Sequence, residues 1–285
     1  MSVQSWLVGA RPRTLPAAIA PVAVGTAAAH PDVDPLHAGL ALVVALALQV
    51  GVNYANDYSD GVRGTDRERV GPLRLVASGA KTASAVKSAA LLSFSIAAVA
   101  GLIVSLRTNV WLLAVGAAAI VAAWRYTGGR SPYGYRGLGE VFVFLFFGPV
   151  AVVGTAYVQS GEVKAEAWLA ALPIGLLITA ILVVNNLRDR PTDAEAGKQT
   201  LAVRIGDRGT RALFVFMVLA PFVGVLALMP WRPLAWLALA ALPQAIWLVR
   251  FVAAGAVGMD LVRALGRTSA LLISFATLLT IGMLL

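Results

Sequence analysis

Long runs of apolar residues alternate with short polar segments along the whole chain. Each run has about 20 residues, the length that an α-helix needs to cross the hydrocarbon core of a bilayer. The pattern predicts nine transmembrane helices, at about residues 15–31, 37–57, 85–106, 109–127, 138–159, 167–187, 211–229, 232–252 and 268–285. A membrane β-barrel is excluded, because it would show short segments in which polar and apolar positions alternate.

Composition supports a membrane protein and excludes a soluble one. Of the 285 residues, 59% are apolar and 13% are charged, which is about half the charged share of a soluble domain. The mean hydropathy of +0.80 also excludes a disordered chain and a coiled coil. There is no cysteine, so disulfides and thiolate chemistry are excluded. The two histidines, His30 and His37, flank one short loop, where we expect solvated side chains rather than a metal site.

The net charge of +9 indicates topology rather than nucleic-acid binding. Of the 23 Lys and Arg residues, all but Arg107, Lys164 and Arg232 fall in alternate polar segments. Cytoplasmic loops of membrane proteins carry such an excess of positive charge. We therefore expect a multi-pass protein of the cell membrane, with its N-terminus on the cytoplasmic side and its C-terminus on the outer side.

Two clusters of Asn and Asp stand at the predicted cytoplasmic ends of the second and sixth spans. The first cluster contains Asn53, Asn56, Asp57, Asp60 and Asp66, and the second contains Asn185, Asn186, Asp189 and Asp193. Each includes an Asn–x₃–Asp step, which places two side chains on one face of a helix. Pro191 disfavours helical geometry at the residue before it. We therefore expect Asp193 to lie on a turn and to fold back toward Asp189.

The clusters combine hard oxygen ligands with nearby cations. Mg²⁺ is held by one or two carboxylates and completes its shell with water and phosphate oxygens, and Arg and Lys bind the phosphate itself. The mixture indicates a Mg²⁺–diphosphate site. Its expected catalytic carboxylates are Asp60, Asp66, Asp189 and Asp193, with Asn56, Asp57 and Asn185 as further metal ligands. The expected diphosphate-binding residues are Arg63, Arg74, Arg130, Arg136 and Lys198. The alternative is that both clusters are ordinary solvated helix ends.

A weak internal repeat relates the two halves of the chain. Val52-Asn53-x₃-Asp57 recurs as Val184-Asn185-x₃-Asp189, 132 residues later. We predict one all-α domain over residues 1–285, with parallel repeats at about 10–137 and 138–267 and a closing helix at 268–285. The two clusters would then face each other across a central cavity that opens to the cytoplasm.

The loop at 125–137 lies on the same predicted face and is rich in aromatic and basic residues. We interpret it as a lid over an aromatic-substrate pocket. The expected pocket residues are Tyr126, Tyr133 and Tyr135 of the loop, together with Arg13, Asn53 and Asn186. The alternative is an interfacial aromatic belt, a common feature of membrane proteins.

These stretches together resemble the UbiA family of intramembrane prenyltransferases. The family motif N-D-x-x-D-x-x-x-D matches at Asn56, Asp57 and Asp60, whereas Gly64 stands at the third Asp position and Asp66 follows two residues later. This longer spacing resembles the branch that prenylates 1,4-dihydroxy-2-naphthoate in menaquinone synthesis. Three further stretches agree, namely residues 11–16, 132–140 and 185–203.

The resemblance implies a Mg²⁺-dependent transfer of a long polyprenyl group. The polyprenyl diphosphate would alkylate 1,4-dihydroxy-2-naphthoate, with loss of diphosphate and CO₂, to give a demethylmenaquinol. Other acceptors in the family remain alternatives: hydroxybenzoate, homogentisate, haem, chlorophyllide or a sugar phosphate. A secondary transporter is a more distant alternative, because transporters place charged residues near the bilayer midplane, whereas here they gather on one face. The bilayer is an expected partner and nucleic acid is not; no oligomeric state is predicted.

Overall fold

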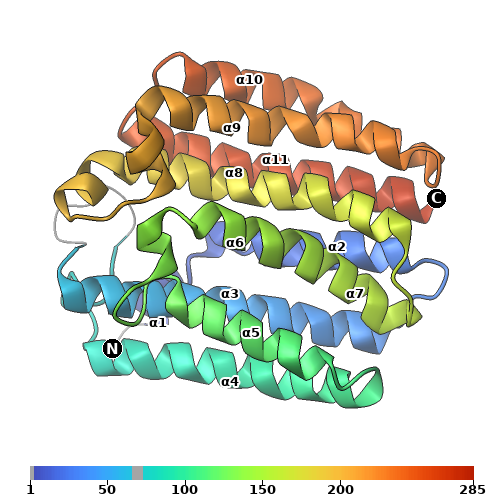
Figure 1. Cartoon of the computed structure of the whole chain (residues 1–285), viewed down its shortest axis with the longest axis horizontal. Coiled ribbons are helices and arrows are strands. Elements are labelled where there is room, and N and C mark those ends of the chain that lie inside the picture. The colour runs from blue at the N-terminus through green and yellow to red at the C-terminus, as the bar shows by residue number, and fades with distance from the viewer. Residues whose placement is uncertain (1–2, 66–72) are drawn as a thin grey trace.

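The structure is a computed structural model that describes residues 3–65 and 73–285, and these two ranges contain helices and no strand (Figure 1). The α-helices are α1 (Val3–Ala10), α2 (Pro16–Ala29), α3 (Pro35–Arg63), α4 (Ala83–Arg107), α5 (Leu112–Arg125), α6 (Gly139–Leu145), α7 (Ala151–Ser160), α8 (Ala165–Glu195), α9 (Leu201–Leu228), α10 (Leu242–Ala253) and α11 (Met259–Leu284). Short 3₁₀ helices are η1 (Pro12–Thr14), η2 (Tyr133–Arg136) and η4 (Pro233–Ala241), and η3 (Phe146–Val150) is a π-helix.

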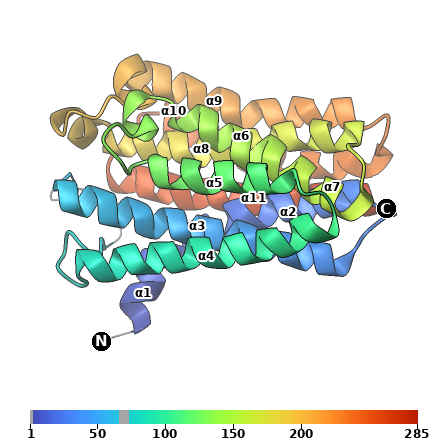
Figure 2. The same ribbon diagram turned by 60° about the horizontal axis from the view of Figure 1, so that its bottom comes forward.

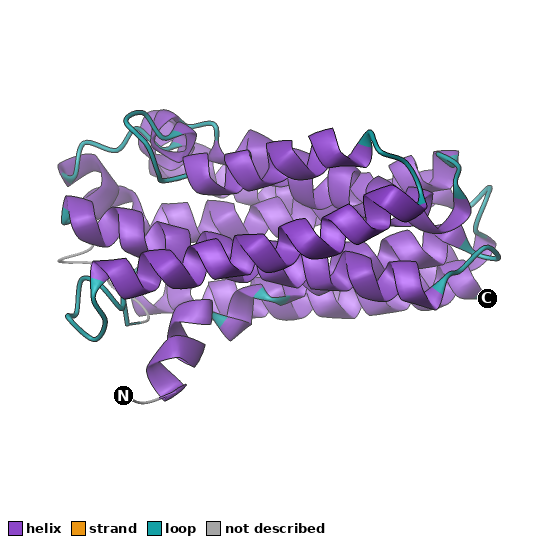
Figure 3. Cartoon of the chain, turned by 90° about the horizontal axis from the view of Figure 1, so that it is seen from below, coloured by secondary structure: helices purple, strands orange, loops and turns teal. Residues whose placement is uncertain are grey.

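The long helices lie side by side in one bundle, and the loops are gathered at its two ends (Figure 3). The N- and C-termini lie at opposite ends of the bundle (Figure 1). Helix α1 projects from the side of the bundle near the N-terminal end (Figures 2 and 3). The prediction of an all-helical membrane protein is confirmed.

Every predicted span coincides with a helix, although not every helix is long. Seven helical segments in the described ranges have the length and hydropathy to cross a membrane, and two of these join a short helix to its neighbour. The first and fourth predicted spans are represented by the shorter apolar helices α2 and α5. Length and composition therefore support seven of the nine predicted crossings, and the other two stay a prediction.

Helix α8 differs from the prediction at its polar end. We expected Pro191 to end the helix, but α8 continues through Pro191 to Glu195, so the expected turn at Asp193 is wrong. Proline removes one donor and crowds one carbonyl, and here it is exposed and lies only one turn before the helix end, where the cost is small. Lys198 N–H closes the end by donating to the carbonyl of Asp193 at 2.8 Å.

The core is centred on α8. Its apolar window is 72% buried, against 17% for that of α3, and it contacts α2, α6, α7, α9 and α11. The main core cluster includes Ile174 and Leu177 of α8, Phe214 of α9 and Phe275 of α11. A smaller cluster around Tyr54, Leu75 and Phe94 joins α3 to α4. The bundle is therefore most densely packed around α8, whereas α3 is less buried and borders the cavity described below.

Large apolar side chains cover much of the outer surface. Leu92, Val99 and Leu106 of α4 are 60–67% exposed, and Val223 and Phe216 of α9 are 69% and 58% exposed. In water such a surface would be unfavourable, but lipid chains solvate it. The bundle is therefore an integral membrane protein.

Candidate active site

A large cavity of about 400 Å³ lies between α2, α3, α5, α7 and α8. At one end it is lined by polar residues from the last turns of α3 and α8 and from the loops beside them. The rest of the lining is apolar and reaches Leu112 and Val158, toward the opposite end of the bundle. The cavity therefore joins a polar head region to a long apolar region. The predicted site residues that line it are Asn53, Asn56, Asp60, Arg74, Tyr126, Tyr133, Tyr135, Asn185, Asn186, Asp189, Asp193 and Lys198.

The polar residues of α3 are fixed by segments distant in sequence. The Asn53 amide donates to the carbonyl of Ala10 at 2.9 Å and to Thr14 Oγ1 at 3.0 Å. Asn56 Oδ1 accepts from Thr127 Oγ1 at 2.8 Å, and Asp60 Oδ1 accepts from the Tyr135 hydroxyl at 2.5 Å. The end of α3 is thereby tied both to the N-terminal segment and to the 125–137 loop.

Asp57 does not line the cavity. Its carboxylate accepts the backbone N–H groups of Leu75 at 2.9 Å and Val76 at 3.0 Å, and the residue is only 1% exposed. One residue of helix separates it from Asn56 by about 100° around the axis, which turns it away from the cavity. The geometry assigns Asp57 to holding the segment after residue 72 against α3.

Three polar residues of α8, Asn185, Arg188 and Asp189, bond one another. Arg188 donates through Nε and Nη2 to both carboxylate oxygens of Asp189, at 2.7 and 2.8 Å, and through Nη2 to Asn185 Oδ1 at 2.9 Å. The Arg188 and Asp189 side chains are 3% and 6% exposed. A two-point ion pair of this kind is strong and directional. Arg188 was not among the predicted site residues, although it lies inside the second motif.

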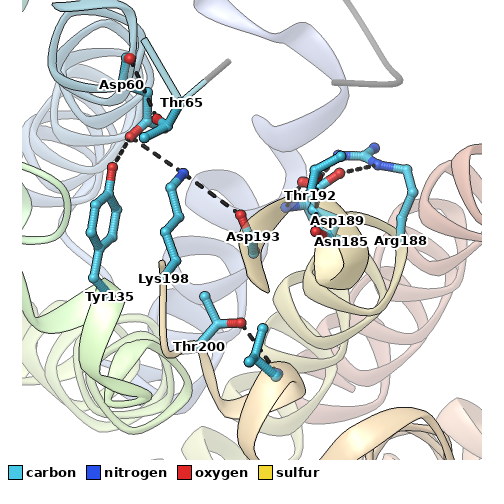
Figure 4. A network of polar contacts seen from close by, with 11 residues as sticks. Asp60, Thr65, Tyr135, Asn185, Arg188, Asp189, Thr192, Asp193, Lys198 and Thr200 are labelled. Atoms are coloured by element: carbon cyan, nitrogen blue, oxygen red, sulfur yellow. Dashed lines mark hydrogen bonds and ion pairs between the residues drawn. The ribbon is translucent and has the colours of Figure 1, made fainter. Parts of the chain in front are cut away.

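Lys198 links the two clusters (Figure 4). Its ammonium lies 3.6 Å from Asp60 Oδ1 of α3 and 3.6 Å from Asp193 Oδ1 of α8, and 4.7 Å from the centre of the Tyr135 ring. The three charged side chains are all buried. The structure therefore brings the two Asp-containing motifs to one place, with a cation between them.

The 125–137 loop supplies aromatic walls to the cavity. Tyr126, Tyr133 and Tyr135 line it, and the Tyr133 ring stacks on Phe142 at 4.1 Å. Burial raises the pKa of Tyr135, and the Asp60 carboxylate raises it further, so its hydroxyl remains a donor to Asp60. Burial likewise raises the pKa of Tyr133.

Four predicted cationic residues do not line the cavity. Arg63 donates to the carbonyls of Thr127 and Gly129 and so anchors the loop to α3. Arg13, Arg130 and Arg136 are exposed. Long charged side chains on loops are solvated unless a partner holds them. These arginines therefore stay outside the cavity, although they lie near its lining residues in sequence. Asp66 lies outside the described residues.

Arg11, rather than Arg13, enters the cavity from the N-terminal segment. It has a left-handed backbone (φ 52°), and its Nη2 atom is buried without a hydrogen-bond partner in the described part of the chain. Strained backbone and an unsatisfied buried donor are costly features that mark functional sites. The Arg-Pro-Arg-Thr stretch was recognised in the sequence, but nothing there distinguished the two arginines.

A third residue missed from the sequence, after Arg188 and Arg11, is Glu140 at the start of α6. It is 5% exposed, and its Oε1 accepts from the Asn186 amide at 2.9 Å. Asn186 lines the cavity and is thereby fixed from behind. Glu140 lies in the stretch 132–140 that carries the family resemblance, but the sequence did not indicate that it bonds Asn186.

Comparison with known proteins assigns the chain to a family. The model of the UbiA prenyltransferase family matches residues 18–258, and the chain belongs to that family. It is 49% identical over 281 residues to the 1,4-dihydroxy-2-naphthoate octaprenyltransferase of Mycobacterium tuberculosis, covering 96% of this chain and 95% of that protein. It is 40% identical over 262 residues to the protein of the same name from Escherichia coli, covering 87% and 85%.

Solved structures share the fold. A UbiA homologue from Aeropyrum pernix superposes with a TM-score of 0.73 at 17% identity, covering 95% of this chain and 98% of that one. A UbiA homologue from Archaeoglobus fulgidus, solved with DMAPP and Mg²⁺, superposes with a TM-score of 0.69 at 15% identity, covering 97% and 99%. The helical arrangement described above is therefore that of the family.

Proposed function

We propose that this protein transfers a long polyprenyl group from a polyprenyl diphosphate to 1,4-dihydroxy-2-naphthoate, releasing diphosphate and CO₂. The product is a demethylmenaquinol, an intermediate of menaquinone synthesis. The observation that carries the proposal is the similarity to 1,4-dihydroxy-2-naphthoate octaprenyltransferases, at 40–49% identity over most of both chains.

The shape of the cavity supports this function. A prenyl diphosphate has a charged head and a water-insoluble tail, and the cavity offers a polar end and a long apolar lining. The three tyrosines of the loop and Asn186 lie at the polar end, where an aromatic acceptor would meet the head of the prenyl group. An enclosed apolar wall also keeps water away from the allylic cation that departure of diphosphate creates.

The donor set at the polar end fits Mg²⁺. Asp60, Asp189 and Asp193 offer hard carboxylate oxygens, and Asn56 and Asn185 offer amide oxygens. Within residues 3–65 and 73–285, no three His, Asp or Glu side chains are grouped closely enough to hold a metal ion by themselves. Mg²⁺ takes one or two protein carboxylates and fills its shell with water and substrate phosphate. When bound, Mg²⁺ neutralises charge on the diphosphate and so favours its departure.

The other polar residues have separate tasks in this proposal. Lys198 and Arg74 bind diphosphate oxygens, and Arg11 extends this positive wall from the N-terminal segment. Tyr135 holds Asp60 in place through its hydroxyl. Glu140 positions the Asn186 amide, which leaves the amide oxygen available to a hydroxyl of the acceptor. Asp66 is proposed as a further metal ligand on the basis of its motif alone.

The reaction is tested with the purified protein in detergent, Mg²⁺, a polyprenyl diphosphate and a panel of acceptors. We expect product with 1,4-dihydroxy-2-naphthoate and little with 4-hydroxybenzoate or homogentisate. EDTA should stop the reaction and added Mg²⁺ should restore it. Turnover of a different acceptor alone would retain the family and reject the naphthoate substrate.

The orientation is proposed from the charge pattern: nine crossings, with the N-terminus and the polar end of the cavity in the cytoplasm. Because the chain has no cysteine, single cysteines can report sidedness at Thr65, Ser131 and Asp34. An impermeant thiol reagent added to intact cells should label only the variant at Asp34. Labelling at Thr65 or Ser131 without permeabilisation would reverse the orientation.

A further inference from the structure

Two pairs of acidic and basic side chains in the site differ in how tightly they are joined. Arg188 holds both oxygens of Asp189 at 2.7 and 2.8 Å, whereas the Lys198 ammonium lies 3.6 Å from Asp60 and 3.6 Å from Asp193. Charge-assisted N–H···O bonds are about 2.7–2.9 Å long. The Asp189 pair is therefore closed, and the contacts of Lys198 are loose.

The ammonium of Lys198 lies between one carboxylate of α3 and one carboxylate of α8. Figure 4 shows its ammonium between the carboxylates of Asp60 and Asp193, which come from α3 and α8. Burying two carboxylates without positive charge is costly, so a cation at this point stabilises the folded protein. Lysine meets this need with a single point charge on a flexible stem.

The Lys198 side chain is held less closely than that of Arg188. Lys198 follows Gly197, which has a left-handed backbone (φ 73°) and ends the turn after α8. The ammonium has no close two-point contact comparable to that of Arg188, and it lies 4.7 Å from the centre of the Tyr135 ring. A small rotation of the stem moves the charge while the carboxylates stay on their helices.

We propose that Lys198 and the divalent ion are alternative counter-ions for Asp60 and Asp193. The inference rests on the metal site of the proposed function. Lys198 neutralises the two carboxylates until metal and diphosphate bind together; the metal then takes the carboxylates, and the ammonium turns to the diphosphate. Asp189 does not take part in the exchange, because Arg188 holds both of its oxygens.

The exchange makes metal and diphosphate binding cooperative. Metal alone must displace a buried ammonium that has no new anion to bind, so it binds weakly. Diphosphate supplies that anion and should raise metal affinity, and the coupling must be reciprocal. The protein would thus avoid filling its metal site before a substrate head group is present.

The test measures Mn²⁺ binding by electron paramagnetic resonance, using the purified full-length protein with and without inorganic pyrophosphate. The Mn²⁺–pyrophosphate complex is measured separately and subtracted. For the wild type we expect weak Mn²⁺ binding that pyrophosphate strengthens about tenfold or more, within the usual range of coupling between two sites. In Lys198→Met we expect Mn²⁺ alone to bind about tenfold more tightly than in the wild type, with most of the pyrophosphate effect lost.

Two further variants keep the outcome interpretable. Lys198→Arg retains the charge and can reach the carboxylates through two N–H groups, so Mn²⁺ alone should bind more weakly than in the wild type. This opposite shift decides the matter if Lys198→Met does not fold. Lys81→Met is the matched control, because Lys81 is as buried as Lys198 but packs over Trp6, away from the cavity; its Mn²⁺ binding should match that of the wild type.

The failures are distinguishable. If Lys198→Met binds Mn²⁺ alone no more tightly than the wild type, or Lys198→Arg binds it no more weakly, the exchange is wrong while the metal site stands. If neither the wild type nor any variant binds Mn²⁺, with or without pyrophosphate, both the exchange and the metal site of the proposed function are rejected.

Discussion

The two Asn–x₃–Asp motifs have the same spacing but opposite relations to the rest of the molecule. On α3, which lines the cavity, each polar side chain bonds a segment far away in sequence: the residues before α2, the segment after residue 72 or the 125–137 loop. On α8, which is the buried centre, Asn185, Arg188 and Asp189 bond one another. The α3 motif holds neighbouring segments in place, whereas the residues of the α8 motif hold one another. Similar sequence motifs can therefore divide a site into an adaptable half and a fixed half.

Removing the carboxylate of either motif should have the largest effect on activity. We expect Asp60→Ala and Asp189→Ala each to lower turnover at least about 100-fold, because each removes charge that stabilises the metal–diphosphate group by several kcal/mol. Prenyl transfer in vitro measures the loss. Asp260→Ala is the control, since Asp260 is a half-buried residue outside the cavity that pairs with Arg263 across one helix turn. Activity above a tenth of the wild-type value in either variant would reject the two-motif site.

The free energy of unfolding should fall more when the closed Arg188–Asp189 pair is broken than when the looser contacts of Lys198 are removed. Arg188→Met leaves the Asp189 carboxylate buried without its two-point partner, which should cost about 3–5 kcal/mol of unfolding free energy. Lys198→Met should cost less, because Asp60 keeps its bond from Tyr135. Thermal unfolding in detergent compares the two. An equal or larger loss in Lys198→Met would contradict the contrast between a closed and a loose pair.

A hydrogen bond to the α3 motif should matter for activity more than an equal bond elsewhere. Thr127→Val removes the donor to Asn56 and should cost about 1 kcal/mol of stability, with a several-fold rise in KM for the prenyl diphosphate. Thr26→Val is the matched control, because Thr26 accepts a bond from Gln159 outside the cavity. The control should lose similar stability and keep its KM. Equal KM values in the two variants would remove the loop from the binding site.

The smallest expected effect concerns alkaline pH. Burial and Asp60 raise the pKa of Tyr135 above its ordinary value of 10 in the folded protein. The unfolded chain then loses its proton first as pH rises above about 10, so stability falls with pH in that range and is unaffected below it. Tyr135→Phe should make this fall shallower. Denaturation curves between pH 8 and 11.5 measure the slopes; identical slopes would show that Tyr135 does not titrate differently on folding.

The sequence predicted the helices well because each span is a long apolar run, a signal that depends on no distant contact. It did not predict α1, since eight residues are too few to show a period, and it placed a helix end at Pro191 because the tolerance of proline near a helix end depends on exposure. The approach of the two motifs was inferred from their repeat, and the parallel repeat itself stays a prediction.

The partners within the site were beyond reach of the sequence. The direction in which Asp57 points, and the choice of Arg11 over Arg13, depend on backbone angles and on a segment that folds back over α3. The spacing places Arg188 beside Asp189 in sequence, but it does not show that the guanidinium turns back to hold both carboxylate oxygens in a buried pair.

The length of α8 also sets the depth of the site. Its 31 residues extend about 46 Å at 1.5 Å per residue, whereas the hydrocarbon core of a bilayer is about 30 Å thick. For a helix along the bilayer normal that starts at one edge of the core, the other edge falls near Asn185. Asp189 and Asp193 then lie at the level of the lipid head groups. A diphosphate could reach them without entering hydrocarbon. The large energetic cost of moving charge into lipid would oppose only the reversed binding mode, in which the diphosphate points into the bilayer.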